Sequence, residues 1–498
     1  MKLDALIAKG ERVSDHRPWP RVVVDEETWR DATAALAAGE LALFGLWGDK
    51  AAVHMAVLAE NALAILSLEC HSGSFPSVGR SHAPAIRLER AVQDLYGLTP
   101  EDASDKRPWL DHGRWQVANP LGQGTFGLQA TGYSFLPVEG EDLHQIPVGP
   151  VHAGIIEPGH FRFTASGETI VRLEERLGYV HKGIESLMAG ASLERAARLA
   201  CHTSGDSAVA YAIAFARAVE AAVEITPPPR AVYLRALMAE LERIANHFGD
   251  FGAICNDASF SIMHAHCGVL RERVLRAANA AFGHRLMMDC IAPGGVVADV
   301  NDSGIAAIQA CVAEIRRRYP ALVEIYDATA SLQDRTVSTG ILKPELARRF
   351  AAGGYVGRAS GRAFDARRNL AYAPYDALSF EVPVQDAGDV DSRVDIRVRE
   401  IQQSLKLIDQ IIAQLPQGAI HTDVPERGGE GLAVAEGFRG DVLAYVRLDG
   451  HGRIARCHLR DPSWFQWPLL EVVVEGNIVA DFPLCNKSFN CSYSGHDL

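Results

Sequence analysis

The sequence predicts an α+β protein in which a small mixed unit precedes a larger, mainly helical body with β-hairpins at its edges. Two observations support this fold class. Short apolar runs of strand character alternate with two helical patterns in the first 136 residues. Beyond a polar segment, apolar residues recur three and four positions apart over long stretches, which is the spacing of helices that pack into a bundle.

Composition places the chain among globular proteins. It has 498 residues, of which 48% are hydrophobic and 22% charged, enough for two or three domains. No apolar run reaches the roughly 18–20 residues that cross a bilayer, and we expect no signal peptide because the first residues lack an apolar core. The net charge of −13 argues against a nucleic-acid partner, since nucleic-acid binders usually present a basic face.

Nine cysteines are scattered through the chain, and none forms a C-x-x-C pair. This pattern is typical of reduced thiols rather than disulfides. It gives no support for a zinc or iron–sulfur site within the chain, so we expect the chain to hold no metal of its own.

Residues 1–136 form the first predicted unit. It contains no nucleophile arrangement, metal cluster or phosphate loop, so we interpret it as a docking domain. Strands are expected at residues 22–24 and 41–47, and helices at 29–38 and 85–96. Residues 137–150 are polar and carry a glycine and several prolines, which predicts a linker.

Residues 151–498 form the second predicted unit. A hairpin is expected where residues 161–165 and 169–175 flank a Ser-Gly-Glu turn. After three prolines at 227–229, apolar residues from 234 to 248 line one face of a helix, and the same spacing recurs from 398 to 415. Residues 432–460 alternate as strands do.

Histidines, acids and arginines recur between residues 149 and 257, as a buried polar site would require. The hairpin begins beside His152 and His160, and Glu185 follows a lysine and a glycine. The helix after the prolines carries Glu240 and Arg243 three positions apart on one face, so these two side chains can pair.

Long, ordered motifs carry a resemblance to a known family. Residues from about 145 to 498 resemble the large subunit of nickel–iron hydrogenases and the quinone-side subunit of complex I, most strongly in the energy-converting, formate-hydrogenlyase-type branch. The N-terminal unit resembles the 30-kDa-type subunit of complex I through residues 75–77, 87–97 and 107–110. The motifs of the larger unit are Gly149-Pro150-Val151-His152, His181-Lys182-Gly183-Ile184-Glu185, Pro228-Pro229-Arg230-Ala231, Ala292-Pro293-Gly294-Gly295-Val296, Tyr375-Asp376 and Asp481-Phe482-Pro483-Leu484.

The resemblance implies a hydrogenase large-subunit-like fold but not its metal centre. The family holds nickel and iron with two C-x-x-C pairs, because soft thiolates stabilise and bridge these metals. Those four positions fall at Ala200, Thr203, Ser492 and Gly495, none of which is a ligand suited to nickel. The sequence ends directly after this segment, at Leu498, which fits our expectation of a chain that receives no nickel.

One alternative keeps a metal through a shift of register. Cys201 and Cys491 each lie one residue from an expected ligand position, and His202 and His496 are near them. A shifted nickel–iron site built from these four residues is the less favoured interpretation, because a bridged binuclear centre tolerates such displacements poorly. Otherwise the two cysteines are small buried hydrophobes.

A quinone is the candidate ligand that the complex I branch implies. In that branch a histidine of the first hairpin loop binds the quinone headgroup, and His160, or with less support His152, matches it. Asp257 matches the acid that orients this histidine. The tyrosine that completes the site falls at Cys201, with His202 beside it, and a thiol is a weak proton donor.

Further residues take expected roles, most of them from the resemblance. Glu185 corresponds to a family glutamate, with Lys182 as its expected cation. Arg439 belongs to a motif that lines the metal pocket, although Phe438 replaces a proline. A glycine-rich segment carries four arginines, for which we expect a structural or electrostatic role. A phosphate-binding site is the alternative. The arginines are Arg358, Arg362, Arg367 and Arg368.

The leading hypothesis is a core subunit of a membrane-bound, complex I-like or hydrogenase-related oxidoreductase, NADH- or quinone-linked, that couples electron transfer to ion translocation. The expected partners are a small subunit carrying an iron–sulfur cluster and membrane-arm subunits, both antiporter-like and of the quinone module. The expected location is the cytoplasmic face of the inner membrane. Direct NADH binding is not expected, because no dinucleotide fingerprint is present. A non-catalytic scaffold and a working hydrogenase are the alternatives.

Overall fold

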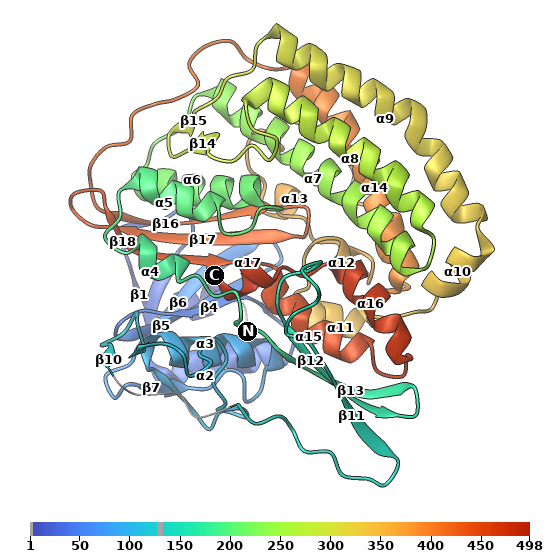
Figure 1. Cartoon of the computed structure of the whole chain (residues 1–498). Helices are drawn as coiled ribbons and strands as arrows, with labels where there is room; N and C mark the ends of the chain where they lie inside the picture. Colours follow the sequence, from blue (N-terminus) through green and yellow to red (C-terminus); the bar gives the residue numbers. More distant parts are fainter. Residues whose placement is uncertain (1–2, 127–132) are drawn as a thin grey trace.

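The chain folds into stacked layers, seen in a computed structural model that describes residues 3–126 and 133–498. Helices of the N-terminal unit cover a five-stranded sheet, and a second sheet lies against the other side of that sheet. The helix α6 (Ala208–Ala222) and a bundle of long helices follow beyond the second sheet (Figure 1). Both predicted units therefore belong to one continuous stack.

The first sheet has the strand order β1-β3-β6-β5-β4, with β3 parallel to β6 and the other pairs antiparallel. Side chains on both faces of β5 and β6 are buried, because helices cover one face and the second sheet covers the other. The elements of this unit are α1 (Leu3–Ile7), β1 (Glu11–Arg12), β3 (Arg21–Val24), α2 (Glu26–Ala37), β4 (Ala42–Gly48), β5 (Ala52–Ala59), β6 (Ala62–Glu69), β7 (Ser74–Pro76), η1 (Ala83–Ala85), α3 (Ile86–Tyr96), β8 (Thr99–Glu101), β9 (Val117–Ala118) and β10 (Thr125–Phe126).

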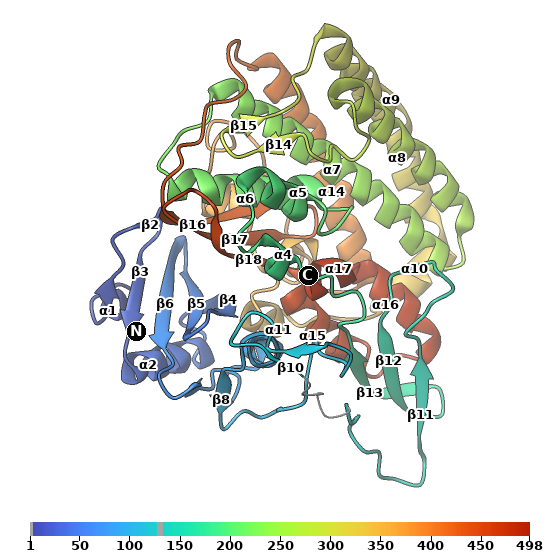
Figure 2. The ribbon, with the colours of Figure 1, turned by 60° about the vertical axis from the view of Figure 1, so that its left-hand side comes forward.

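The second sheet joins the two predicted units, because it takes strands from both. Its order is β18-β17-β16-β2, where β2 (His16–Arg17) pairs in parallel with β16 (Gly429–Glu436). β17 (Asp441–Leu448) and β18 (Ile454–Arg460) complete it, and Figure 2 shows β2 beside β16. Residues that the sequence places at the periphery thus form a central sheet, since both of its faces are covered.

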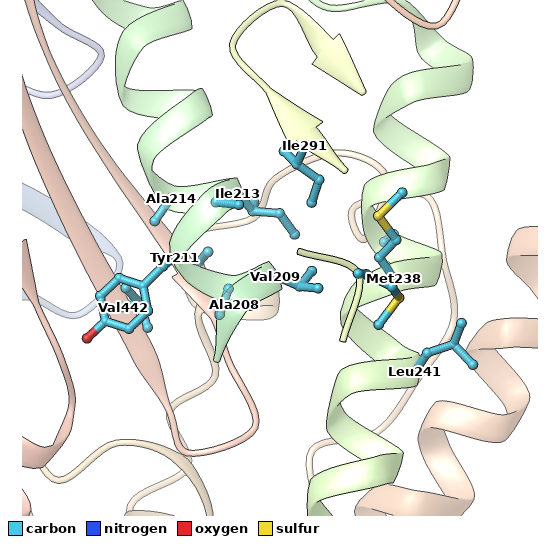
Figure 3. Packing of buried hydrophobic residues seen from close by; sticks show 14 of the residues in the cluster. Ala208, Val209, Tyr211, Ile213, Ala214, Met238, Leu241, Ile291 and Val442 are labelled. Atoms are coloured by element: carbon cyan, nitrogen blue, oxygen red, sulfur yellow. The ribbon is translucent and has the colours of Figure 1, made fainter. Parts of the chain in front are cut away.

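Close packing of α6 on β16 depends on two glycines and many alanines. A Cβ atom at Gly431 would lie 2.0 Å from the carbonyl oxygen of Ala218, and one at Gly429 would lie 2.1 Å from that of Ala222. Figure 3 shows Val209 and Ile213 of α6 facing Met238 of the next helix. Small residues on one side and branched residues on the other let α6 fill the space between the sheet and the bundle.

The helical body is built on α7, which starts at a proline in its first turn and runs for 29 residues. It packs against α8 on one side and α14 on the other, and α8 packs against α9. These four helices are α7 (Pro229–Asp257), α8 (Ser261–Phe282), α9 (Asp302–Ala328) and α14 (Val390–Ala413).

Shorter elements frame the sheets and the bundle. A three-stranded antiparallel sheet of β11, β12 and β13 projects at one edge (Figure 1). The remaining elements are β11 (Leu143–Val148), β12 (His160–Ser166), β13 (Thr169–Arg176), α4 (Ile184–Met188), α5 (Leu193–Cys201), β14 (Ile291–Ala292), β15 (Gly295–Val296), α10 (Ala330–Thr336), α11 (Pro344–Arg349), α12 (Gly354–Arg358), α13 (Ala366–Asn369), α15 (Ser463–Val473), η2 (Val479–Asp481), α16 (Phe482–Phe489) and α17 (Tyr493–Asp497).

The α+β class and the long helices that the sequence predicts are confirmed. The predicted hairpin corresponds to β12 and β13 and lies at an edge, as expected. Within the predicted linker, residues 143–148 form β11, whose polar pattern did not suggest a strand but which pairs with β12. The division into docking domain, linker and larger domain stays a prediction.

Among the described residues, no helix combines the length and apolar character needed to span a bilayer.

We expect the N-terminal unit to share its stability with the rest of the chain, because Phe44 packs across the boundary. Its ring lies 5.9 Å from that of Phe364, and the Arg460 guanidinium lies 4.7 Å from its centroid. Replacing Phe44 by alanine should lower the free energy of unfolding by about 3–5 kcal/mol, measured by urea unfolding and circular dichroism. The exposed control I155A should change it by less than about 0.5 kcal/mol. Separate melting of the N-terminal unit would contradict the expectation.

Candidate functional site

The two segments that hold metal in nickel–iron hydrogenases meet in this structure. The Ser204 and Ser492 hydroxyl oxygens lie 3.3 Å apart, joining the loop after α5 to the C-terminal segment. Thr203 donates its hydroxyl to a backbone carbonyl four residues earlier, and Ser492 caps α17 by accepting from the Gly495 N–H. A Cβ atom at Gly495 would lie 2.4 Å from an Asp461 oxygen, so no larger side chain fits there.

The residues at the four expected ligand positions therefore do not fit a nickel–iron centre. Alanine and glycine offer no donor atom, and both hydroxyls are neutral and engaged with the backbone or a neighbouring serine. The Ser204–Ser492 contact joins the two segments directly.

Arg439 lies between the same two segments. Its Nη2 donates to Asp206 Oδ2 at 2.6 Å, and its Nε donates to the Asn490 carbonyl oxygen at 2.6 Å. Burial opposes ionisation of Asp206, but the Arg439 charge outweighs it and lowers the pKa of this carboxyl to about 2. The arginine that the resemblance assigns to a cofactor pocket thus joins the loop after α5 to the chain's last residues.

The shifted metal site stays a prediction, and among residues 3–126 and 133–498 its four members do not form one ligand cluster. Cys201 and His202 do come together with a third ligand type, but that ligand is Asp289 rather than Cys491 or His496. His496 lies between Trp109, which donates to its Nε2 at 3.2 Å, and the ring of Trp464. Because α5 ends at Cys201, its last side chains turn toward the loop before β14 and away from the C-terminal segment.

His160 and His152 fasten the loop between β11 and β12. Arg162 Nε donates to His160 Nε2 at 3.4 Å, while His160 Nδ1 lies 3.3 Å from the Gly149 carbonyl oxygen and donates to it. His152 Nε2 lies 2.7 Å from the Gly159 carbonyl oxygen. Burial lowers the pKa of His160, so its imidazole is held neutral.

Asp257 does not orient His160, contrary to the expected pairing. Both ring nitrogens of His160 already have other partners. Asp257 lies at the end of α7, where burial raises its pKa and Asn256, Lys487 and His264 are its polar neighbours. Asp257 is the last residue of the 29-residue helix α7. The sequence motifs did not show where the end of this helix lies relative to the hairpin loop.

Glu185 is paired, but not with the expected lysine. Its carboxylate accepts from His458 Nδ1 at 2.7 Å and lies 2.9 Å from Arg456 Nη1, both on β18. Burial works against this charge, yet Arg456 and His458 lower the pKa of Glu185 to about 2. Lys182 instead donates to the Thr203 carbonyl oxygen at 2.6 Å, which ties its segment to the loop after α5.

One face of α7 carries a buried ionic network. The predicted pairing of Glu240 with Arg243 is confirmed at 3.3 Å. Glu240 also accepts from Arg367 at 3.0 Å and from the Tyr375 and Ser404 hydroxyls at 2.6 Å each. These donors keep the pKa of Glu240 below its ordinary value despite burial, which by itself would raise it.

The network continues through Glu400 of α14. Glu400 accepts from His247 Nε2 at 2.8 Å and from Arg358 Nε at 2.8 Å. Arg358 also donates to Glu436 at 2.9 Å. Burial and the neighbouring Asp365 raise the pKa of Glu436 to about 7, so this carboxyl titrates near neutral pH. In the glycine-rich segment, Arg358 therefore binds carboxylates, as the structural interpretation expects, and does not serve a phosphate site.

A second set of contacts, one turn beyond His247 on α7, reaches the C-terminal segment. Asp250 lies 3.1 Å from Arg397 Nε and accepts from Asn490 Nδ2 at 2.9 Å. The Asn490 carbonyl in turn accepts from Arg439. Polar groups thus extend from Glu240 in the bundle to the loop after α5.

Sequence reasoning missed several members of this network. Glu400, Asp250 and Asp206 were not singled out, although residues 240, 243, 247 and 250 share one helix face at helical spacing. That spacing was the available signal. Asp289 carried no signal, because its neighbours in space come from a segment 88 residues away.

Comparisons with known proteins agree with this geometry. The profile of the family described as respiratory-chain NADH dehydrogenase, 49 Kd subunit, matches residues 259–497. Formate hydrogenlyase subunit 5 of Escherichia coli is 30% identical, covering 87% of this chain and 78% of that protein. The carbon monoxide-induced hydrogenase of Rhodospirillum rubrum is 30% identical, covering 70% and 97%.

Two further similarities bear on the fold. An NADH-quinone oxidoreductase subunit of Dehalococcoides mccartyi is 31% identical, covering 67% of this chain and 92% of that protein. A chain of the membrane-bound sulfane sulfur reductase, an archaeal respiratory membrane complex, superposes with a TM-score of 0.68. It is 24% identical and covers 73% of this chain and 100% of that chain.

Removing the charge of Glu400 should destabilise the chain strongly, because Arg358 and His247 would stay buried and lose the negative charge that they share. We expect E400Q to lower the free energy of unfolding by about 3–5 kcal/mol, measured by chemical denaturation at pH 7. The control D409N removes an exposed partner of Arg316 from the same helix and should cost less than about 1 kcal/mol. Equal effects of the two variants would refute a stabilising network.

The paired Glu185 predicts a specific acid sensitivity. A folded pKa of about 2, against an ordinary value of 4.5, means that its contribution is complete above about pH 5 and is lost as the pH falls toward 2. Between pH 6 and pH 3 the stability advantage of the native chain over E185Q should shrink by about 2 kcal/mol. Denaturation at several pH values measures this, with the exposed E194Q as the control. A constant difference across that range would contradict the assignment.

Proposed function

The chain belongs to the family of the complex I 49-kDa subunit and the related hydrogenase large subunits, and from this premise we propose that it is a core peripheral-arm subunit of a membrane-bound oxidoreductase complex. In this proposal the complex couples NADH- or quinone-linked electron transfer to ion translocation. The chain contributes the pocket walls and the coupling helices, and it holds no nickel–iron site.

The observation that carries the proposal is the combination of lost donors and retained charges. The four expected ligand positions have no thiolate, and the Ser204 and Ser492 hydroxyls join the two segments that carry them. The ionic network on α7 is nevertheless complete, with Glu240, Glu400 and Asp250 each paired. A chain that had lost all function would be under no demand to keep buried charges, which are costly to desolvate.

The network supports a coupling role because it includes a group that can change charge near neutral pH. Glu436 has a pKa of about 7 and shares Arg358 with Glu400. A change in the protonation of Glu436 would alter the contacts of Arg358 with Glu436 and Glu400. Because Glu400 lies on α14 and binds His247 of α7, the change would affect both helices. We infer that this connection transmits events at the partner interface into the helical bundle.

The loop between β11 and β12 is the surface we assign to the partner subunits. Val151 is 74% exposed and Ile155 is 85% exposed, although both are apolar. Exposed apolar side chains on a loop whose base is fixed by His152 and His160 support docking against another protein. The partners proposed are an iron–sulfur small subunit and membrane-arm subunits of the antiporter-like and quinone-module types, at the cytoplasmic face of the inner membrane.

A quinone headgroup remains part of the proposal at this loop, with His160 as its hydrogen-bond donor and with Cys201 and His202 at the position where the resemblance expects the tyrosine. The occupied nitrogens of His160 favour a second form of the proposal, in which the chain is a non-catalytic coupler. The two forms differ in the effect of H160Q on quinone reduction by the purified complex. Loss of reduction favours the quinone form, and unchanged reduction favours the coupler.

Purification from native membranes tests the proposal as a whole. A tagged full chain should co-purify with an iron–sulfur subunit and antiporter-like membrane subunits, identified by mass spectrometry. Nickel should be far below the one atom per chain that a hydrogenase requires, measured by elemental analysis. Recovery of the chain alone and free of membranes, or nickel at about one per chain, would overturn the proposal.

A further inference from the structure

Three side chains of different ligand types converge where α5 ends. A sulfur, a ring nitrogen and a carboxylate oxygen from Cys201, His202 and Asp289 all lie within 4.8 Å of one another. His202 Nε2 lies 3.1 Å from both Asp289 oxygens, and the Asp289 backbone N–H donates to Cys201 Sγ at 3.3 Å. Two residues come from the end of a helix and the third from a loop far along the chain, so tertiary folding assembles the group.

The loop that carries Asp289 is held in place by its own contacts. His284 Nδ1 accepts from the backbone N–H groups of Leu286 and Met288. Cys290, next in the chain, is buried and donates to the Phe282 carbonyl oxygen. Asp289 itself has a φ of 59°, in the left-handed region that non-glycine residues seldom adopt. Its carboxylate is therefore presented to Cys201 and His202 by a fixed backbone.

Thiolate, imidazole and carboxylate together form a donor set that suits a zinc-type cation. Two negative ligands would balance a 2+ charge. Cys201 is the last residue of α5, and the negative end of that helix favours a cation there. In a tetrahedral site with bonds of about 2.0–2.3 Å, ligand atoms stand about 3.3–3.7 Å apart. The 3.1 Å between His202 Nε2 and the Asp289 oxygens is near this spacing, and the sulfur lies within 4.8 Å of both ligands.

The group is open on one side. The side chain of Cys201 is buried, whereas those of His202 and Asp289 are 50% and 46% exposed. Water can therefore reach the metal position as a fourth ligand, as in zinc sites with three protein ligands.

We propose that Cys201, His202 and Asp289 form a mononuclear site for a divalent cation of the zinc type, completed by water. This site is separate from the family's binuclear centre. It uses none of the four positions at Ala200, Thr203, Ser492 and Gly495, and its third ligand comes from the loop between α8 and β14. The metal site does not depend on the proposed function of the complex.

Metal titration of the purified full chain tests the site. The chain is stripped with chelator under a phosphine reductant and then titrated with Zn²⁺ or with Co²⁺ as a coloured probe. We expect about one equivalent to bind, with a sulfur-to-cobalt charge-transfer band in the near ultraviolet. C201S should abolish that band, and H202Q and D289N should each weaken Zn²⁺ binding by at least about tenfold.

Matched controls separate this site from other thiols and from unfolding. C290S removes a neighbouring buried thiol, and C491S removes the cysteine of the C-terminal segment; both should bind Zn²⁺ as the native chain does. Circular dichroism of each metal-free variant should match the native spectrum. Zinc binding that is unchanged in C201S and D289N, or that is lost in C491S instead, would overturn the proposal. So would a failure of the native chain to bind Zn²⁺.

Discussion

A buried charge in the helical body is costly unless an opposite charge meets it, and the arrangement of the site depends on this constraint. An isolated carboxylate or guanidinium in a protein interior costs several kcal/mol. Glu240, Asp250 and Glu400 escape that cost only because Arg367, Arg397 and Arg358 reach them from other elements. The pairs lock α7 and α14 to the glycine-rich segment, so the helices that form the bundle cannot move independently.

The loop after α5 and the C-terminal segment are joined although the four expected ligand positions carry no thiolate. Arg439 joins them by binding Asp206 on one side and the Asn490 carbonyl on the other, and the Ser204 and Ser492 hydroxyls also meet. Hydrogen bonds and an ion pair therefore hold this junction.

The N-terminal unit contributes more than a docking surface. β2 extends the central sheet, Trp47 stacks on His458 of β18 with ring centroids 4.9 Å apart, and Arg460 donates to the Phe44 carbonyl oxygen. His458 also binds Glu185, which follows Lys182 and Gly183, whose backbone N–H groups donate to the Leu498 carbonyl oxygen. The first unit therefore contacts the ring that pairs with Glu185.

The sequence by itself determined the α+β class, the long helices, the Glu240–Arg243 pair and the absence of thiolates at the four ligand positions, because helical spacing and residue type are local properties. Only the tertiary structure decided which acids and bases meet. It placed His458 rather than Lys182 on Glu185, separated His160 from Asp257, and joined Asp289 to Cys201. Such partners lie tens to hundreds of residues apart, and their meeting depends on how whole helices and sheets pack, which no local pattern encodes.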